Sequence, residues 1–521
     1  MKRIFLILNI LSLVTATTCS AQPAWTKKAA QAVFTLKTFG ADGQLVGSSN
    51  GFFVGEDGEA VSSFAPFKGA QRAVVIDAQG KELAVEYLTG ANELYDVAKF
   101  KVDSKKTTAL KTAPAEVANG TALWLLPYAV KKVPAVVEGK VSSAERFQQD
   151  FSYYTLDMNS MEQQSGCPIV NANGEAVGIL QPSADGKQGV SYAVSARYAN
   201  TLRISGLALN DPALKATAIA KALPDNLDEA IVSLFVSSST MTEAAHTDYI
   251  ERFIQKFPEA IDGYIYRARI RAAHGELQAA DDDMEQAVKV ATNKDDAYYQ
   301  YAQLVYQKAL YGQAANGWTL DRALELSRKA SAINALPVYR QQQAQILYGQ
   351  EKYQEAYDLF SALSQTPLRS ADNYYAAAQC QQMLGDKKAA LALLDSAVAQ
   401  FTLPYVKTAA PYLSARAQLE MELRRYQQAI NDMKSVVELE PTNALYLAEK
   451  ANMEVRVGLL DDGIQTAEEC IRQAPEMSDG YLLLGLAQCK KDRKAEGLKN
   501  LQKAKELGNS QAQSFIDKYS K

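Results

Sequence analysis

The chain has 521 residues, of which 47% are apolar and 22% are charged, with a formal net charge of −4. This composition is that of a globular protein long enough for more than one hydrophobic core, and no basic domain stands out that would favour nucleic acid as a partner. The two histidines and five cysteines are scattered along the sequence, so we expect no metal site and no other cofactor.

The first 21 residues have the pattern of a bacterial secretory signal peptide. Lys2 and Arg3 precede an almost continuous apolar stretch, 4–14, and small and polar residues follow up to Ala21. The stretch is too short for a stable membrane span. We therefore expect export to the periplasm or secretion, with no transmembrane helix after cleavage. A retained N-terminal anchor is the alternative, and lipoprotein anchoring at Cys19 is disfavoured because the two threonines before it fit a lipobox poorly.

The mature chain has two kinds of sequence pattern. Residues 22–205 contain short apolar stretches separated by Gly, Asp and Asn turns, which indicates a β-sandwich or barrel. The segment 206–224 holds Pro212 and Pro224 and is the expected linker. Residues 225–521 are rich in Ala, Leu and Gln with helical periodicity. The clearest predicted strands are 32–36, 51–54, 72–76, 97–102 and 176–180.

The helical half repeats with a period of 34 residues, interrupted by insertions of eight and five residues. A small residue recurs at Ala268, Ala302, Ala344, Ala378, Ala417, Ala451 and Gly485, and most units have a second one 12 positions later. Such spacing lets the two helices of a unit approach closely, and stacked units then bury a continuous core. The pattern resembles tetratricopeptide repeats (TPR). We expect seven clear units, a degenerate one beginning near Leu227, and a capping helix at 511–519.

An all-α TPR solenoid usually binds peptides on the face built from the first helix of each unit. The residue after each small anchor is expected to point there, and five of these residues are amides: Gln303, Gln345, Gln379, Gln418 and Asn452. Amides donate and accept, so this amide row could pair with an extended peptide backbone. The alternative is that glutamine is simply a good helix former on a solvated face.

The N-terminal half resembles a trypsin-like serine protease of the HtrA/Deg type. The matching segments are GFFVGEDG at 51–58, DVAKFKV at 96–102, VEGKVSSA at 137–144, SGCPIVN at 165–171, GEAVGI at 174–179 and GVSYAV at 189–194. The resemblance implies an all-β double barrel of the chymotrypsin type over residues 22–205, with peptides or proteins as ligands. It also implies a nucleophile at Ser165 and the acid of a catalytic triad at Asp96.

The base of that triad is missing. The family pattern places a histidine seven residues after Gly58, where this chain has Ala65, and the only histidines are in the helical half. A serine hydroxyl needs a positioned base to become a nucleophile. The oxyanion loop has changed as well, because Gln163 replaces the usual glycine before Ser165. After the serine, Gly166 is kept, but Cys167 stands in place of a second glycine.

We therefore expect a protease-like domain without catalytic residues, attached to a TPR array, in an exported peptide- or protein-binding scaffold. One alternative is a working serine endopeptidase with another base, such as Lys68, or with Cys167 as nucleophile. A split site that uses His246 or His274 is the least favoured arrangement. The other alternative is an envelope chaperone or assembly factor. The sequence does not separate this last function from a scaffold, and it does not identify the ligand.

Overall fold

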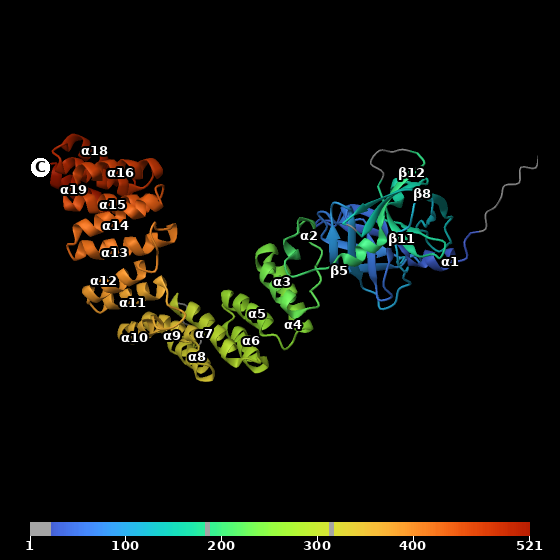
Figure 1. The fold of residues 1–521 in the computed structure, drawn as a ribbon, viewed down its shortest axis with the longest axis horizontal. Helices are drawn as coiled ribbons and strands as arrows, with labels where there is room; N and C mark the ends of the chain where they lie inside the picture. The colour runs from blue at the N-terminus through green and yellow to red at the C-terminus, as the bar shows by residue number, and fades with distance from the viewer. Residues whose placement is uncertain (1–21, 149, 183–187, 312–316) are drawn as a thin grey trace, which may run out of the picture. The chain divides into compact units, whose positions relative to one another are not determined.

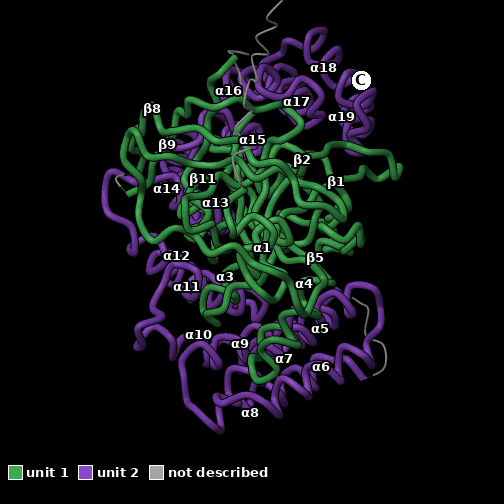
Figure 2. Tube along the Cα trace, turned by 90° about the vertical axis from the view of Figure 1, so that its right-hand side faces the viewer, with its two compact units in different colours: residues 1–263 green, residues 264–521 purple. Residues whose placement is uncertain are grey.

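The computed structural model describes residues 22–148, 150–182, 188–311 and 317–521. Contacts divide the chain into two compact units, Met1–Gly263 and Tyr264–Lys521, which Figure 2 colours green and purple. The predicted signal peptide, 1–21, lies outside the described residues. None of the helices in the described ranges is long and apolar enough to cross a membrane.

The first unit begins with a closed barrel of six antiparallel strands in the order β1-β2-β3-β6-β5-β4 (Figure 1). Its interior contains Phe34, which packs against Phe53 and Phe100, and all three rings are buried. Alternate residues of β1 and β6 are buried, as expected of strands with one face on a core. The strands are β1 (Val33–Phe39), β2 (Leu45–Phe53), β3 (Glu59–Ser62), β4 (Arg72–Ile76), β5 (Glu82–Asn92) and β6 (Val97–Val102).

A second closed barrel follows in the order β10-β11-β12-β9-β8-β7. Its strands are β7 (Ala122–Leu125), β8 (Val137–Phe147), β9 (Phe151–Asp157), β10 (Pro168–Val170), β11 (Ala176–Gln181) and β12 (Val190–Ser195). Short helical turns flank the barrels: α1 (Thr26–Ala29), η1 (Ala30–Ala32), η2 (Ala65–Phe67), η3 (Glu162–Gln164) and η4 (Ala196–Thr201). The predicted double β-barrel is confirmed, and the predicted strands 72–76 and 97–102 coincide with β4 and β6.

The segment 206–224 is bound along the first barrel. It contains η5 (Ala208–Asn210) and α2 (Pro212–Lys215), and then runs in extended conformation beside β5. The backbone of Leu88 donates to Ala220 and accepts from Ala222, both at 2.8 Å. The expected linker is therefore part of the first unit. Helices α3 and α4 also fall in this unit, so the division between units comes at 263/264 instead of near 225.

The remainder of the chain is helical and forms consecutive helix pairs from α5 to α18, followed by α19. Thr319, Ser370 and Asn443 accept hydrogen bonds from the first turns of α8, α11 and α15 and so define where these helices begin. The elements are α3 (Leu227–Thr240), α4 (Glu243–Lys256), α5 (Ile261–Ala273), α6 (Leu277–Val290), α7 (Lys294–Leu310), α8 (Leu320–Ile333), α9 (Pro337–Gly349), α10 (Tyr353–Leu363), α11 (Ala371–Met383), α12 (Lys387–Val398), η6 (Lys407–Ala409), α13 (Ala410–Glu422), α14 (Tyr426–Leu439), α15 (Ala444–Val457), α16 (Leu460–Gln473), α17 (Ser478–Lys490), α18 (Lys494–Glu506) and α19 (Ala512–Tyr519).

The 34-residue pattern has a counterpart in the backbone. The small anchors of α5, α7, α9, α11, α13 and α15 are fully buried alanines. Seven positions after the anchor, and one or two residues after the helix ends, six of the first helices are followed by a residue with positive φ. Glycine occupies this position three times, at Gly275, Gly385 and Gly458, whereas Glu351, Arg424 and Asp492 adopt the same conformation at some steric cost. The predicted register therefore marks equivalent places in the helix pairs.

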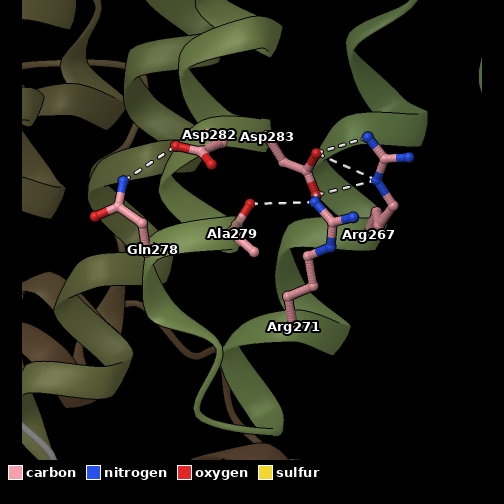
Figure 3. Close-up of polar contacts among 6 residues, drawn as sticks. All are labelled: Arg267, Arg271, Gln278, Ala279, Asp282 and Asp283. Atoms are coloured by element: carbon pink, nitrogen blue, oxygen red, sulfur yellow. Dashed lines mark hydrogen bonds and ion pairs between the residues drawn. The ribbon is translucent and has the colours of Figure 1, made fainter.

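Buried ion pairs join the two helices of some units. In α5 and α6, Asp283 is only 3% exposed and accepts from Arg267 Nη2 at 2.7 Å and from Arg271 Nη1 at 2.8 Å (Figure 3). In α13 and α14, Arg416 holds Asp432 through two bonds of 2.7 and 2.9 Å. Arg267 and Arg416 each stand one residue before the alanine anchor of their helix. These bidentate pairs fix the orientation of helices whose anchors carry almost no side chain.

Candidate active site

The three triad positions come from both barrels. Ala65 begins η2 just after β3, and Asp96 lies in the turn between β5 and β6 of the same barrel. Ser165 follows η3 and precedes β10 of the second barrel. Hydrogen bonds connect these loops, so the structure does bring together the positions that the resemblance had singled out.

Asp96 is held against the loop that carries Ala65. Its Oδ1 accepts the backbone N–H of Ala65 at 2.6 Å, and its own carbonyl accepts the backbone N–H of Phe64. Its Oδ2 is buried and has no hydrogen-bond partner in the described part of the chain. Burial raises the pKa of Asp96, while the N–H of Ala65 and the Ser63 hydroxyl act in the opposite direction. The carboxyl group thus binds the backbone of Ala65, a residue whose methyl side chain stands in place of the imidazole that a triad needs.

The nearest polar neighbour of the Ser165 hydroxyl is another serine. Ser165 Oγ lies 3.0 Å from the Oγ of Ser63, which is 2% exposed. A neutral hydroxyl is far too weak a base to take a proton from a second hydroxyl at neutral pH. Sequence analysis missed Ser63. The available signal was its position, directly after β3 and two residues before Ala65.

The loop around Ser165 has its donors already engaged. The backbone N–H of Ser165 donates to the carbonyl of Glu162 at 3.0 Å, within the turn of η3. The next two N–H groups, of Gly166 and Cys167, donate to Leu180 at 2.8 Å and Gln164 at 3.0 Å. Oxyanion stabilisation needs donors that point at the reacting carbonyl before the reaction begins. In this conformation the N–H of Ser165 is not such a donor.

Asn50 of the first barrel fixes this loop in place. Its side-chain Nδ2 donates to the carbonyl of Gln163 at 2.6 Å, and its backbone N–H donates to the carbonyl of Ser165 at 2.8 Å. Gly166 has φ of +83°, and a Cβ built there would lie 2.0 Å from the carbonyl oxygen of Asn50. The retained glycine therefore has a steric explanation that does not depend on catalysis. Sequence analysis did not identify Asn50.

The alternative catalytic groups are poorly placed for their tasks. Cys167 is fully buried, and burial raises the pKa of its thiol to about 12, so it is not the thiolate that attack requires. The Nζ of Lys68 pairs with Glu93 at 2.6 Å on a half-exposed surface. It lacks the burial that turns a lysine into a base. His246 lies in α4 and its Nδ1 bonds the hydroxyl of Ser237.

The predicted amide row occupies equivalent positions on α7, α9, α11, α13 and α15. Gln345, Gln418 and Asn452 are exposed, while Gln303 and Gln379 are half-buried. The side chain of Gln418 makes one long contact, of 3.4 Å, with Ser414. No hydrogen bond to the other four side-chain amides is found within the described ranges. Their part in binding stays a prediction.

Tyrosines from neighbouring first helices pack together near this row. The rings of Tyr299 and Tyr339 lie 5.4 Å apart, and those of Tyr375 and Tyr412 lie 5.9 Å apart in an edge-to-face arrangement. The phenol of Tyr412 also donates to Asp372. Tyr299 and Tyr375, four residues before Gln303 and Gln379, therefore make contacts that link successive helix pairs.

Comparison with known proteins places the match in the barrels. Residues 49–179 match the family model described as a trypsin-like peptidase domain. Among solved structures, the HtrA-type protease AlgW with a decapeptide has 20% identity and a TM-score of 0.28, covering 34% of this chain and 64% of AlgW. The serine endoprotease from Yersinia pestis has 19% identity and a TM-score of 0.30, covering 36% and 65%. The chain thus spans less than two thirds of these structures. No curated protein matches it.

Proposed function

We propose that this chain is an exported protein that binds peptides or proteins without cleaving them. It joins an inactive protease-like domain of HtrA type to an array of tetratricopeptide repeats. The observation that carries the proposal is the residue facing Asp96. Ala65 gives the carboxylate a backbone N–H at 2.6 Å but no imidazole, so the Ser165 hydroxyl has no base.

Two further observations support the loss of catalysis. The N–H of Ser165 is engaged by the Glu162 carbonyl, and Asn50 holds the Gln163 and Ser165 carbonyls. Removing one oxyanion donor costs an enzyme about a hundredfold or more in rate. Absence of the base alone costs on the order of a thousandfold to a millionfold. The losses affect the same step, and together they make cleavage negligible.

Binding is assigned to the helical half because its first helices present amides at equivalent positions. An extended peptide crossing α7 to α15 would meet one amide per unit, and each amide offers a donor and an acceptor to the peptide backbone. Such pairing does not depend on the side chains of the bound peptide, which suits a protein that binds peptides of many different sequences. Each net hydrogen bond is worth about 1 kcal/mol, so several together would give useful affinity.

The competing function is that of a serine endopeptidase with Asp96 as a remote base. It is favoured by the contact of 3.0 Å between Ser165 and Ser63, because the Ser63 hydroxyl also acts on Asp96, where it lowers the pKa of the carboxyl group. In this arrangement a proton would pass from Ser165 to Ser63 and from Ser63 to Asp96. The engaged N–H of Ser165 argues against it, since the transition state would still lack its donor.

The test is capture without cleavage. Fluorescein-labelled unfolded casein is mixed with the purified mature protein, and anisotropy and gel electrophoresis follow binding and cleavage. We expect a rise in anisotropy with the casein intact. Replacing Gln303, Gln345, Gln379 and Gln418 with alanine should weaken binding by tenfold or more.

Surface glutamines on second helices provide the matched control. Gln354 on α10 and Gln428 on α14 are exposed, and their replacement by alanine removes an amide without touching the row. Equal weakening in the control and test variants would contradict the role of the row. Fragmentation of casein that disappears with Ser165→Ala would contradict the proposed function as a whole.

A further inference from the structure

A cavity of about 560 Å³ lies in the first unit, away from Ser165 and its neighbours. One wall is the segment 214–221, which runs beside the first barrel, and Gly69 and Gln71 of that barrel complete it. The opposite wall comes from the end of α3, the loop at Met241, and α4 through Ala245, Asp248 and Arg252. A cavity of this size is in the range that holds small molecules.

Lys221, in the wall formed by the segment 214–221, is an unusual residue for a cavity lining. Its side chain is buried, with 8% exposed, and its Nζ donates to the carbonyl of Thr217. The backbone is fixed on the other side, because Leu88 bonds both Ala220 and Ala222. The ammonium group is therefore held at a defined place in the cavity wall. One of its three N–H groups has a partner here, and the described part of the chain shows no ion pair to it.

Burial of an unpaired ammonium costs free energy. Desolvation lowers the pKa of Lys221 to about 8, so the group is still mostly charged at neutral pH. The cavity is lined by three cationic side chains, Lys215, Lys221 and Arg252, and by the single carboxylate of Asp248. Asp248 is engaged by Arg252 at 2.9 Å. The lining thus has an excess of positive charge that no described residue neutralises.

The rest of the lining is mostly apolar. Leu209, Leu214, Ile219 and Met241 contribute to it, together with the alanines of the extended segment. A phosphate would need several converging donors or a guanidinium fork. Here Arg252 is engaged by Asp248 and Lys215 by Asn210, which leaves the ammonium of Lys221 beside apolar side chains. A ligand with a single carboxylate and an apolar body matches both the ammonium of Lys221 and the apolar lining. It would supply Lys221 with its missing counter-ion and cover the apolar lining.

We propose that this cavity is a binding site for a monocarboxylate with an apolar body, whose carboxylate pairs with the Nζ of Lys221. The site is independent of the function proposed above, because none of its residues belongs to the Ser165 loop or to the amide row. Two sources have the required chemistry: a free aliphatic acid, and the terminal carboxylate of a peptide with apolar last residues.

Titration calorimetry with octanoate and with acetyl-trileucine distinguishes these sources. Binding of either one to the mature protein, with one site per chain, is expected, and the tighter of the two identifies the source. Octanamide has the same apolar chain without the charge and should bind at least tenfold more weakly than octanoate. Equal binding of octanamide and octanoate would overturn the proposal, as would absence of binding by both carboxylates.

Three variants assign the site to Lys221. Lys221→Met keeps the length of the side chain and should weaken carboxylate binding about tenfold or more. Met241→Glu places a repelling charge at the half-buried rim without changing the core, and should have the same effect if Lys221→Met does not fold. Lys105→Met, at an exposed position of the same unit, should leave binding unchanged. Unchanged affinity in Met241→Glu or in folded Lys221→Met would overturn the assignment.

Discussion

Replacing Glu420 with glutamine should stabilise the helical unit, and the gain should depend on pH. Glu420 lies on α13 and is 5% exposed, and its Oε2 is buried without a hydrogen-bond partner in the described ranges. Burial, with a smaller contribution from Asp432, raises the pKa of Glu420 from the ordinary 4.5 to about 7. Arg416 lowers the pKa but is itself engaged by Asp432. The folded chain therefore favours the protonated carboxyl group.

The sign and size of the effect follow from this pKa. Below pH 4.5 the group is protonated in both the folded and the unfolded chain, and its ionisation costs nothing. Between pH 4.5 and 7 only the unfolded chain loses the proton, so stability falls as the pH rises. Above pH 7 the full penalty is reached, with an upper value of about 3.4 kcal/mol for a pKa difference of this size. Water penetration reduces this penalty, and we expect Glu420→Gln to raise the free energy of unfolding at pH 8 by about 1–3 kcal/mol.

Urea unfolding followed by far-UV circular dichroism measures the effect. At pH 8, Glu420→Gln should shift the unfolding midpoint upward relative to the parent chain, and at pH 4.5 the two midpoints should nearly coincide. Glu438→Gln on α14 is the control, because Glu438 is exposed and its replacement should leave both midpoints unchanged. A Glu420→Gln chain less stable than the parent at pH 8 would refute the reasoning, since it would mean that the ionised carboxylate is stabilising.

Three other substitutions test separate parts of the structure. Arg424→Gly, at a position with φ of +61°, should raise the free energy of unfolding by up to about 1 kcal/mol in urea titrations. Gly166→Ala should lower the melting temperature far more than Gly189→Ala, because a Cβ meets a carbonyl oxygen at 2.0 Å at the first position and open space at the second. Ala65→His alone should leave fluorophosphonate labelling of Ser165 undetectable, because the backbone N–H of Ser165 stays engaged. Ala65→His combined with Gln163→Gly should produce labelling. Labelling of the single variant would contradict this reasoning, since it would show that the Ser165 loop opens readily.

The architecture was largely readable because each half has a distinct pattern of apolar residues. The short apolar stretches 72–76 and 97–102 predicted strands that the structure confirms residue for residue. The 34-residue spacing placed alanine anchors that are fully buried. The end of the first unit was not readable, because Pro212 and Pro224 suggested a linker. In the structure Leu209, Leu214 and Ile219 of this segment are buried, and backbone hydrogen bonds at Leu88 hold it to the barrel. Such bonds leave no trace in the side-chain pattern.

The candidate site was only partly readable for a similar reason. Ala65, Asp96 and Ser165 were located by their order in the chain, and hydrogen bonds do bring their loops together. The contacts that define the state of the site come from Ser63 and Asn50. Both are common polar residues whose importance lies in the atoms they meet across the two barrels. No local sequence motif predicts such long-range contacts.

The proposal that Ser165 is not a nucleophile is tested most directly by fluorophosphonate labelling of the purified mature protein. The reagent reports whether a serine hydroxyl is activated by a base and an oxyanion site together. We predict no labelling above that of Ser165→Ala, over hours and between pH 6 and 9, with trypsin as the positive control. Labelling of the parent chain that is lost in Ser165→Ala would contradict the account and would identify the chain as a serine hydrolase.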